Sequence, residues 1–155
     1  MRVTIVAIGQ RLPVWAAAAV DDYAKRLPSE WRFDLKALKA EPRNGRNAAA
    51  LVAVERQRIE AALPRDARRI VLDERGKRVT TAQLAAQLRA WQRDARDVAF
   101  IIGGPDGLDA ALVSAADERL RLSDLTLPHA LARVLLVEAL YRAESLNAGH
   151  PYHRA

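Results

Sequence analysis

Short apolar segments alternate along the chain with longer segments that carry one apolar stripe. Residues 2–8 are rich in β-branched side chains and stop at Gly9, which is typical of a buried strand. Residues 31–38 place apolar side chains at every second position, the pattern of a half-buried strand. Further strands are expected at residues 68–72, 97–102 and 120–122. Helices are expected at residues 13–27, 48–63, 80 or 81 to about 95, 109–118, and from 126 or 127 to about 146.

This alternation predicts an α/β fold, with a mostly parallel sheet covered by helices on both faces. The sequence has no internal repeat or linker, so residues 1–155 are expected to form one domain. In such sheets, ligands bind beyond the carboxyl ends of the strands. The segments after Leu72, Ile102 and Leu122 are therefore the candidate binding loops. The first of them, residues 73–78, is polar, contains Gly76 and is expected to be a turn.

Charge and cysteine content narrow the class of protein further. The 155 residues include 25 Lys and Arg against 19 Asp and Glu, and this net charge of +6 favours an anionic partner such as nucleic acid. Half of the residues are hydrophobic, which excludes a disordered chain. The absence of cysteine excludes disulfide scaffolds, thiol nucleophiles and cysteine-based zinc sites. No segment has the pattern of a signal peptide or of a membrane span, so a cytoplasmic protein is expected.

Residues 103–107, with the sequence GGPDG, form the first motif with chemical meaning. Gly103 and Gly104 lack a Cβ atom, so a ligand can approach the backbone closely. The motif lacks the spacing of a dinucleotide-binding fingerprint and the Gly-Lys-Ser/Thr of a phosphate loop. The alternative is an ordinary turn between a strand and a helix.

The second motif, residues 122–129, follows the last expected strand. Its backbone amides and carbonyls have no strand partners and are available to a ligand. Pro128 is placed where a proline opens a helix, so His129 falls in the first helical turn. The alternative is a helix capped by Thr126, with His129 as an ordinary surface residue.

The last helix is apolar on nearly every side from residue 130 to 141, interrupted only by Arg133 and Glu138. A helix of this kind is buried all round, which favours a surface shared with a second copy in a homodimer. The alternative is a central helix in the core of one copy. Glu138 and Arg142 are spaced for an ion pair along the helix.

The tail, residues 149–154, gathers His150, Tyr152, His153 and Arg154. These side chains can transfer protons, stack on a base and hold a phosphate. The alternative is a frayed terminus. Pro151 disrupts the helical spacing that metal ligands need, so no metal site is expected.

Arg43 and Arg46, in the loop 41–47, are candidate phosphate contacts, with a solvated surface as the alternative.

Four motifs in order carry a resemblance that covers almost the whole chain. They are LD-x-x-G at 72–76, IIGGPDG at 101–107, LSDLTLPHALARVLLVEALYRA at 122–143 and HPYHR at 150–154. The chain resembles the bacterial ribosomal RNA large subunit methyltransferase H family of the SPOUT class. The resemblance implies a C-terminal trefoil knot and S-adenosylmethionine as cofactor. It also implies methylation of N3 of a 23S rRNA pseudouridine, in the stem-loop near the decoding centre of assembled ribosomes.

Carried over position by position, the resemblance implies two sets of residues. The cofactor contacts fall on Leu72, Gly103, Gly104, Leu122, Ser123, Asp124, Leu125, Thr126 and Leu127. The candidates for substrate handling are His129, Arg142, Tyr152 and His153. Arg43, Arg46 and Arg154 are expected RNA contacts on the separate ground of their charge. Relatives vary at Asp124, so its side chain is expected to be dispensable.

Removal of the N3 proton requires a base, for which His129 or His153 is suited. Arg142 or Arg154 can stabilise the developing oxygen charge, and Tyr152 can stack on the base. Two other readings stay open on the residues alone: a non-enzymatic RNA-binding protein, and a nucleotide-binding protein of flavodoxin-like type.

Overall fold

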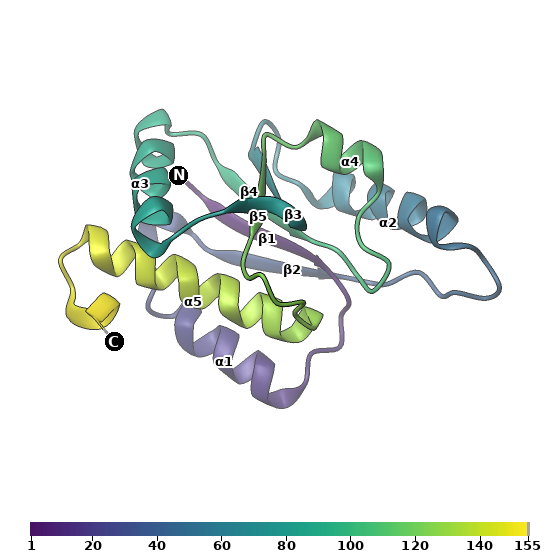
Figure 1. Ribbon diagram of the computed structural model, residues 1–155, viewed down its shortest axis with the longest axis horizontal. Coiled ribbons are helices and arrows are strands. Elements are labelled where there is room, and N and C mark those ends of the chain that lie inside the picture. The colour runs from purple at the N-terminus through teal and green to yellow at the C-terminus, as the bar shows by residue number, and fades with distance from the viewer. Residues whose placement is uncertain (155) are drawn as a thin grey trace.

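The computed structural model describes residues 1–154 as a five-stranded parallel sheet with helices on both faces (Figure 1). Ala155, the last residue of the expected domain, lies outside the described residues. The strands, given in sheet order, are β2 (Asp34–Leu38), β1 (Val3–Ile8), β4 (Val98–Ile102), β3 (Arg68–Arg78) and β5 (Glu118–Arg121). The predicted α/β class is confirmed, and every strand pair is parallel.

The helices divide between the two faces of the sheet. They are α1 (Val14–Ala24), α2 (Ala48–Ala62), α3 (Thr81–Asp94), α4 (Ala110–Ala115) and α5 (His129–Asn147), with short 3-10 turns η1 (Ser29–Trp31) and η2 (Pro151–Arg154). Helices α1, α3 and α5 pack on one hydrophobic layer, while α2 and α4 pack on the other. All of β1 and β4 is buried, as a sheet covered on both faces requires.

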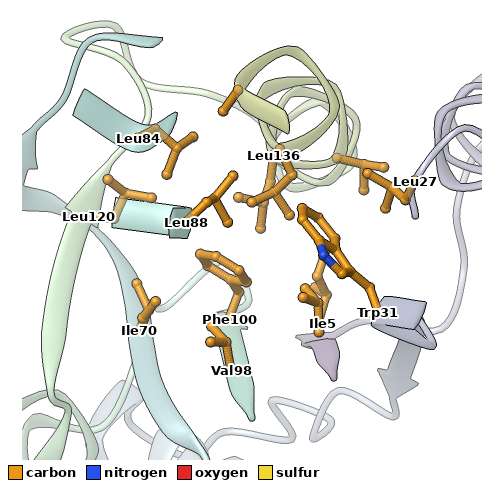
Figure 2. Packing of buried hydrophobic residues seen from close by; sticks show 14 of the residues in the cluster. Ile5, Leu27, Trp31, Ile70, Leu84, Leu88, Val98, Phe100, Leu120 and Leu136 are labelled. Carbon is orange, nitrogen blue, oxygen red and sulfur yellow. The ribbon is translucent and has the colours of Figure 1, made fainter. Parts of the chain in front are cut away.

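Alternation along β1 explains how one strand serves both layers. Val3 and Ile5 point into the layer under α1, α3 and α5, whereas Val6 and Ile8 point into the layer under α2 and α4. In the larger layer, side chains from several elements point toward one another around Phe100 (Figure 2). The core therefore fixes the central strands, whose carboxyl ends carry the candidate loops.

Strand β3 continues through the segment expected to be a polar turn. It pairs with β5 at Leu72 and again from Lys77, and residues 73–76 between them form an irregularity in the ladder. Gly76 makes the close approach possible, since a Cβ atom there would lie 2.7 Å from the Leu120 carbonyl carbon. The prediction of a turn at 73–78 was wrong, because pairing with β5 supplies hydrogen bonds that the local sequence does not reveal.

Three further boundaries differ from expectation. Trp31 belongs to η1, and β2 begins only at Asp34 because Arg32 adopts a left-handed conformation with φ of 44°. Helix α4 is shorter than expected, because Asp109 caps it and the chain leaves the helix after Ala115 to form β5. Helix α5 begins at His129, with Pro128 rather than Thr126 at its N-cap position.

Helix α5 lies along the sheet between α1 and α3 (Figure 1). None of its residues is fully exposed, and Leu136, Val137, Leu140 and Ala143 are completely buried. Packing within one copy therefore accounts for much of its apolar character. The composition of this helix alone does not require a second copy.

Candidate active site

A cleft of about 730 Å³ opens at the carboxyl ends of β4 and β5, beside the irregular middle of β3 and the first turn of α5. Its volume is in the range of cofactor sites. The expected cofactor residues that line it are Leu72, Gly103, Gly104, Leu122, Ser123, Leu125, Thr126 and Leu127. His129 also lines the cleft. The three loops chosen from the positions of the strands thus meet in one place.

Gly103 is the tightest point of the cleft wall. The loop folds back on itself, with the Gly107 amide donating to the Gly104 carbonyl at 3.0 Å. A Cβ atom on Gly103 would lie 2.7 Å from the Gly107 carbonyl oxygen, a contact that only movement of the backbone could relieve. The glycine at this position is therefore a condition for the shape of the loop.

The loop that leads into α5 presents backbone groups to the cleft. The Leu125 amide donates to Ser123 Oγ at 2.9 Å, which stabilises the bend of the loop. The Asp124 carboxylate instead pairs with Arg78 at 2.9 Å and with Arg121 at 3.5 Å, and Asp124 does not line the cleft. This arrangement is consistent with a dispensable side chain at position 124.

Several charged residues of the cleft were not among the site residues expected from the sequence. Arg75, Asp106, Arg119 and Arg121 all line it. Asp106 belongs to the GGPDG motif, and the three arginines flank the irregular pairing of β3 with β5. The positions of these residues close to strand ends could have marked them as site residues. The expectation of a turn at residues 73–78 left out the pairing of β3 with β5, which brings the arginines to the cleft.

The basic loop 41–47 approaches the cleft from the other side. Arg43 donates to Asp106 at 2.9 Å, which ties this loop to the GGPDG motif. Arg46 pairs with Glu41 at 2.8 Å. The pKa of Glu41 is lowered from its ordinary value, chiefly by its hydrogen bond to Arg58 and further by Arg46. Both candidate RNA contacts are therefore positioned by acidic partners, next to the candidate cofactor site.

Arg133 fixes the start of α5 against the sheet. Its side chain is buried, and Nη2 donates to the Ile8 carbonyl at 2.8 Å and to the Gly9 carbonyl at 2.7 Å. Burial lowers the pKa of Arg133 from its ordinary value. The sequence marked this arginine only as an interruption of an apolar helix. The structure shows that it joins the helix behind the cleft to the carboxyl end of β1.

The tail is wound into η2 and is held by hydrogen bonds. The His150 amide donates to the Ser145 carbonyl at 2.8 Å, and His153 Nδ1 lies 2.6 Å from the His150 carbonyl oxygen. A carbonyl can only accept, so His153 Nδ1 carries the proton and Nε2 is the acceptor in the neutral ring. The alternative of a frayed terminus is therefore wrong for residues 150–154.

The tail follows the carboxyl end of α5 (Figure 1), whereas the cleft is lined by residues of the first turn of the helix. His129 lies at the start of the helix, whereas Arg142 and the tail lie near its end. The 19 residues of α5 span about 28 Å. The tail packs back against Glu138 and Tyr141 in the second half of the helix, and none of residues 150–154 lines the cleft of the same copy.

The described residues contain neither a membrane-spanning helix nor a metal site. No helix within residues 1–154 is long and apolar enough to cross a bilayer. Within the same residues, no group of three or more His, Asp or Glu side chains is arranged to hold a metal ion.

Comparisons with known proteins agree with this geometry. The family model described as "Predicted SPOUT methyltransferase" matches residues 1–153. Two similar proteins are named ribosomal RNA large subunit methyltransferase H. The one from Methylibium petroleiphilum is 66% identical and the one from Leptothrix cholodnii 63%, each over 99% of both chains.

Among solved structures, a probable methylase family protein from Haemophilus influenzae Rd KW20 has a similar fold. The TM-score is 0.56 at 13% identity, over 97% of this chain and 69% of that one. This likeness bears on the fold alone, whereas the family model and the close relatives bear on the chemistry. The chain belongs to the SPOUT methyltransferases and, within them, to the ribosomal RNA large subunit methyltransferase H family.

Proposed function

We propose that this protein transfers a methyl group from S-adenosylmethionine to N3 of a pseudouridine in 23S rRNA. The proposed target is the stem-loop near the decoding centre, in assembled ribosomes of the cytoplasm. The observation that carries the proposal is the cleft at the strand ends, formed by three loops in a chain that belongs to this methyltransferase family. The names of the close relatives support large-subunit rRNA as the substrate.

The cleft has the features that a charged, nucleoside-like cofactor requires. Gly103 lets the GGPDG loop close on itself at the cleft, and the backbone groups of Leu122, Ser123 and residues 125–127, which line the cleft, are candidates to bind an adenine ring. Asp73 and Glu74 line the cleft and supply negative charge for an ammonium or sulfonium group, whereas Asp106 is already paired with Arg43. When bound, S-adenosylmethionine supplies an electrophilic methyl group on sulfur. The main task of the protein is then to align the acceptor nitrogen with that group.

The acceptor nitrogen bears a proton, so the protein must also supply a base. His153 is suited to this role because Nδ1 is held by the His150 carbonyl, which leaves Nε2 to accept a proton. His129, in the cleft wall, is the second candidate. Arg142 and Arg154 are candidates to stabilise the developing charge on the uracil oxygen or to hold a phosphate.

The separation of tail and cleft leads to a homodimer as the working form. We infer that the tail of one copy completes the cleft of the other, because no residue of the tail lines the cleft of its own chain. Val14 and Trp15, at the start of α1, are 86% and 55% exposed. Leu125, at the cleft, is 76% exposed. The adjacent exposed side chains of Val14 and Trp15 are candidates for a contact with another chain.

Mixing two inactive variants is expected to restore methyl transfer if the site is shared between copies. One partner carries Gly103→Val in the cleft and the other carries His153→Ala in the tail. Only the mixed dimer contains one intact cleft facing one intact tail, so up to about half of the parental activity per dimer is expected. Differently tagged copies, purified as heterodimers, provide the measurement. Heterodimers that show no methyl transfer would exclude the shared site.

Methyl incorporation from labelled cofactor distinguishes the proposed substrate from simpler RNA. The substrates compared are unmodified assembled ribosomes and naked 23S rRNA from the same cells. A net charge of +6 and a single small domain favour recognition of a large preformed surface, so ribosomes are expected to be methylated at least about tenfold faster. Equal incorporation into both would contradict the ribosome requirement. Label at a position other than N3 of a pseudouridine would contradict the assigned base.

A further inference from the structure

The Tyr152 hydroxyl group joins the tail to two helices at once. It lies 3.2 Å from the Tyr23 hydroxyl of α1 and 3.2 Å from Glu138 Oε1 of α5. A carboxylate only accepts, so Tyr152 donates to Glu138 and accepts from Tyr23. Arg142 Nε donates to the same carboxylate oxygen at 2.8 Å. A continuous chain of hydrogen bonds therefore runs from α1 through the tail to α5.

The Tyr152 ring has neighbours from the same elements. Its centroid lies 4.6 Å from that of Tyr141 and 6.5 Å from that of Tyr23, and the Arg142 guanidinium lies 4.9 Å from it. Such ring pairs and cation contacts are favourable. The ring is half-buried among them. Tyr152 is therefore placed to anchor the tail rather than to stack on an RNA base.

Electrostatics keep this hydroxyl group a donor. Burial, the Tyr23 hydroxyl and the Glu138 carboxylate all raise the pKa of Tyr152. A protonated phenol is the form that donates to Glu138, so the anchoring hydrogen bond persists at neutral pH.

We propose that Tyr23 and Glu138 are positioning residues for the reaction, because they hold Tyr152 and thereby orient His153. His153 directly follows Tyr152, and its ring is already tied to the His150 carbonyl. A displacement of the tail therefore moves the candidate base relative to the acceptor nitrogen. The role in the reaction rests on the proposed function, in which the tail enters an active site. Nothing in the sequence pairs Tyr23 with a residue 129 positions away.

The replacement Tyr23→Phe tests the anchor by removing one oxygen atom while keeping the ring. We expect backbone hydrogen exchange in residues 148–154 to become several-fold faster. We expect kcat to fall about tenfold while KM for S-adenosylmethionine stays within about twofold, since misplaced groups lower the rate without touching the cofactor loops. The matched control is Tyr141→Phe. It removes a hydroxyl group from the same aromatic cluster but outside this chain of hydrogen bonds, and is expected to behave as the parent.

A pair of variants at Glu138 tests the other end of the chain of hydrogen bonds. Glu138→Gln keeps an oxygen acceptor for Tyr152 and is expected to retain more activity than Glu138→Ala, with a smaller change in tail exchange. Parental exchange and kcat in Tyr23→Phe, or equal losses in Tyr141→Phe, would overturn the proposal. Faster exchange with unchanged kcat would overturn the positioning role.

The exchange measurement separates this inference from the function on which it rests. A parent protein that fails to methylate ribosomes refutes the proposed function. The difference in tail exchange between Tyr23→Phe and Tyr141→Phe still decides whether the hydroxyl chain holds the tail.

Discussion

Replacement of Gly103 by valine is expected to weaken binding of S-adenosylmethionine by about 100-fold or more, equivalent to roughly 2.7 kcal/mol. The added Cβ atom would lie 2.7 Å from the Gly107 carbonyl oxygen, so the GGPDG loop must shift. The shift changes the wall of the cleft, while β4 beneath the loop stays buried on both faces. Isothermal titration calorimetry with S-adenosylmethionine measures the loss, and ATP serves as a comparison ligand that is expected not to bind the parent.

Gly45→Ala is the control for this prediction. Gly45 has φ of +75°, so alanine there is strained, but no other atom lies within 4 Å of the added Cβ atom. Its cofactor affinity is expected to match that of the parent. Parental affinity in the valine variant would show that residues 103–107 form only a turn. Binding of ATP in place of S-adenosylmethionine would contradict the proposed cofactor.

His153→Ala is expected to lower turnover by about 10²–10⁴-fold, the usual contribution of a general base. Cofactor affinity is expected to stay within about twofold, because no residue of the tail lines the cleft of the same chain. Single-turnover methylation of ribosomes at saturating cofactor measures the chemical step directly.

His150→Ala is the matched control within the tail. It removes the ring that accepts from the Tyr152 amide at 3.2 Å, but it keeps the carbonyl group that holds His153. Its effect on the single-turnover rate is therefore expected to be much smaller. Equal rates for His153→Ala and the parent would refute His153 as the base and leave His129 as the candidate.

The fold could be predicted largely because its elements are specified locally. The β-branched residues 2–8 have the pattern of a buried strand. In a parallel sheet, the segments after Leu72, Ile102 and Leu122 then lie on the same side of the molecule, where they line one cleft. The cleft follows from that geometry alone. Membership of a methyltransferase family then excludes the two other readings, a non-enzymatic RNA-binding protein and a flavodoxin-like protein. The trefoil knot stays a prediction from resemblance.

What sequence reasoning missed depends on contacts between distant segments. Strand β3 extends past Leu72 only because β5 pairs with it. The buried Arg133 satisfies carbonyl groups more than 120 residues away, which no local pattern reveals. Tyr152 of the tail contacts Tyr23 and Glu138, which lie on two different helices. Local periodicity contains no information about such pairs.

The two edge strands of the sheet, β2 and β5, limit how copies of this protein can associate. Strand β5 has four residues, of which Glu118, Arg119 and Arg121 are charged, and β2 has five, including Asp34 and Lys36. Short, charged edge strands oppose the addition of a strand from another molecule. A continuous sheet across two copies, and the aggregation that it invites, are therefore disfavoured. Contacts between copies must instead form through helices and loops.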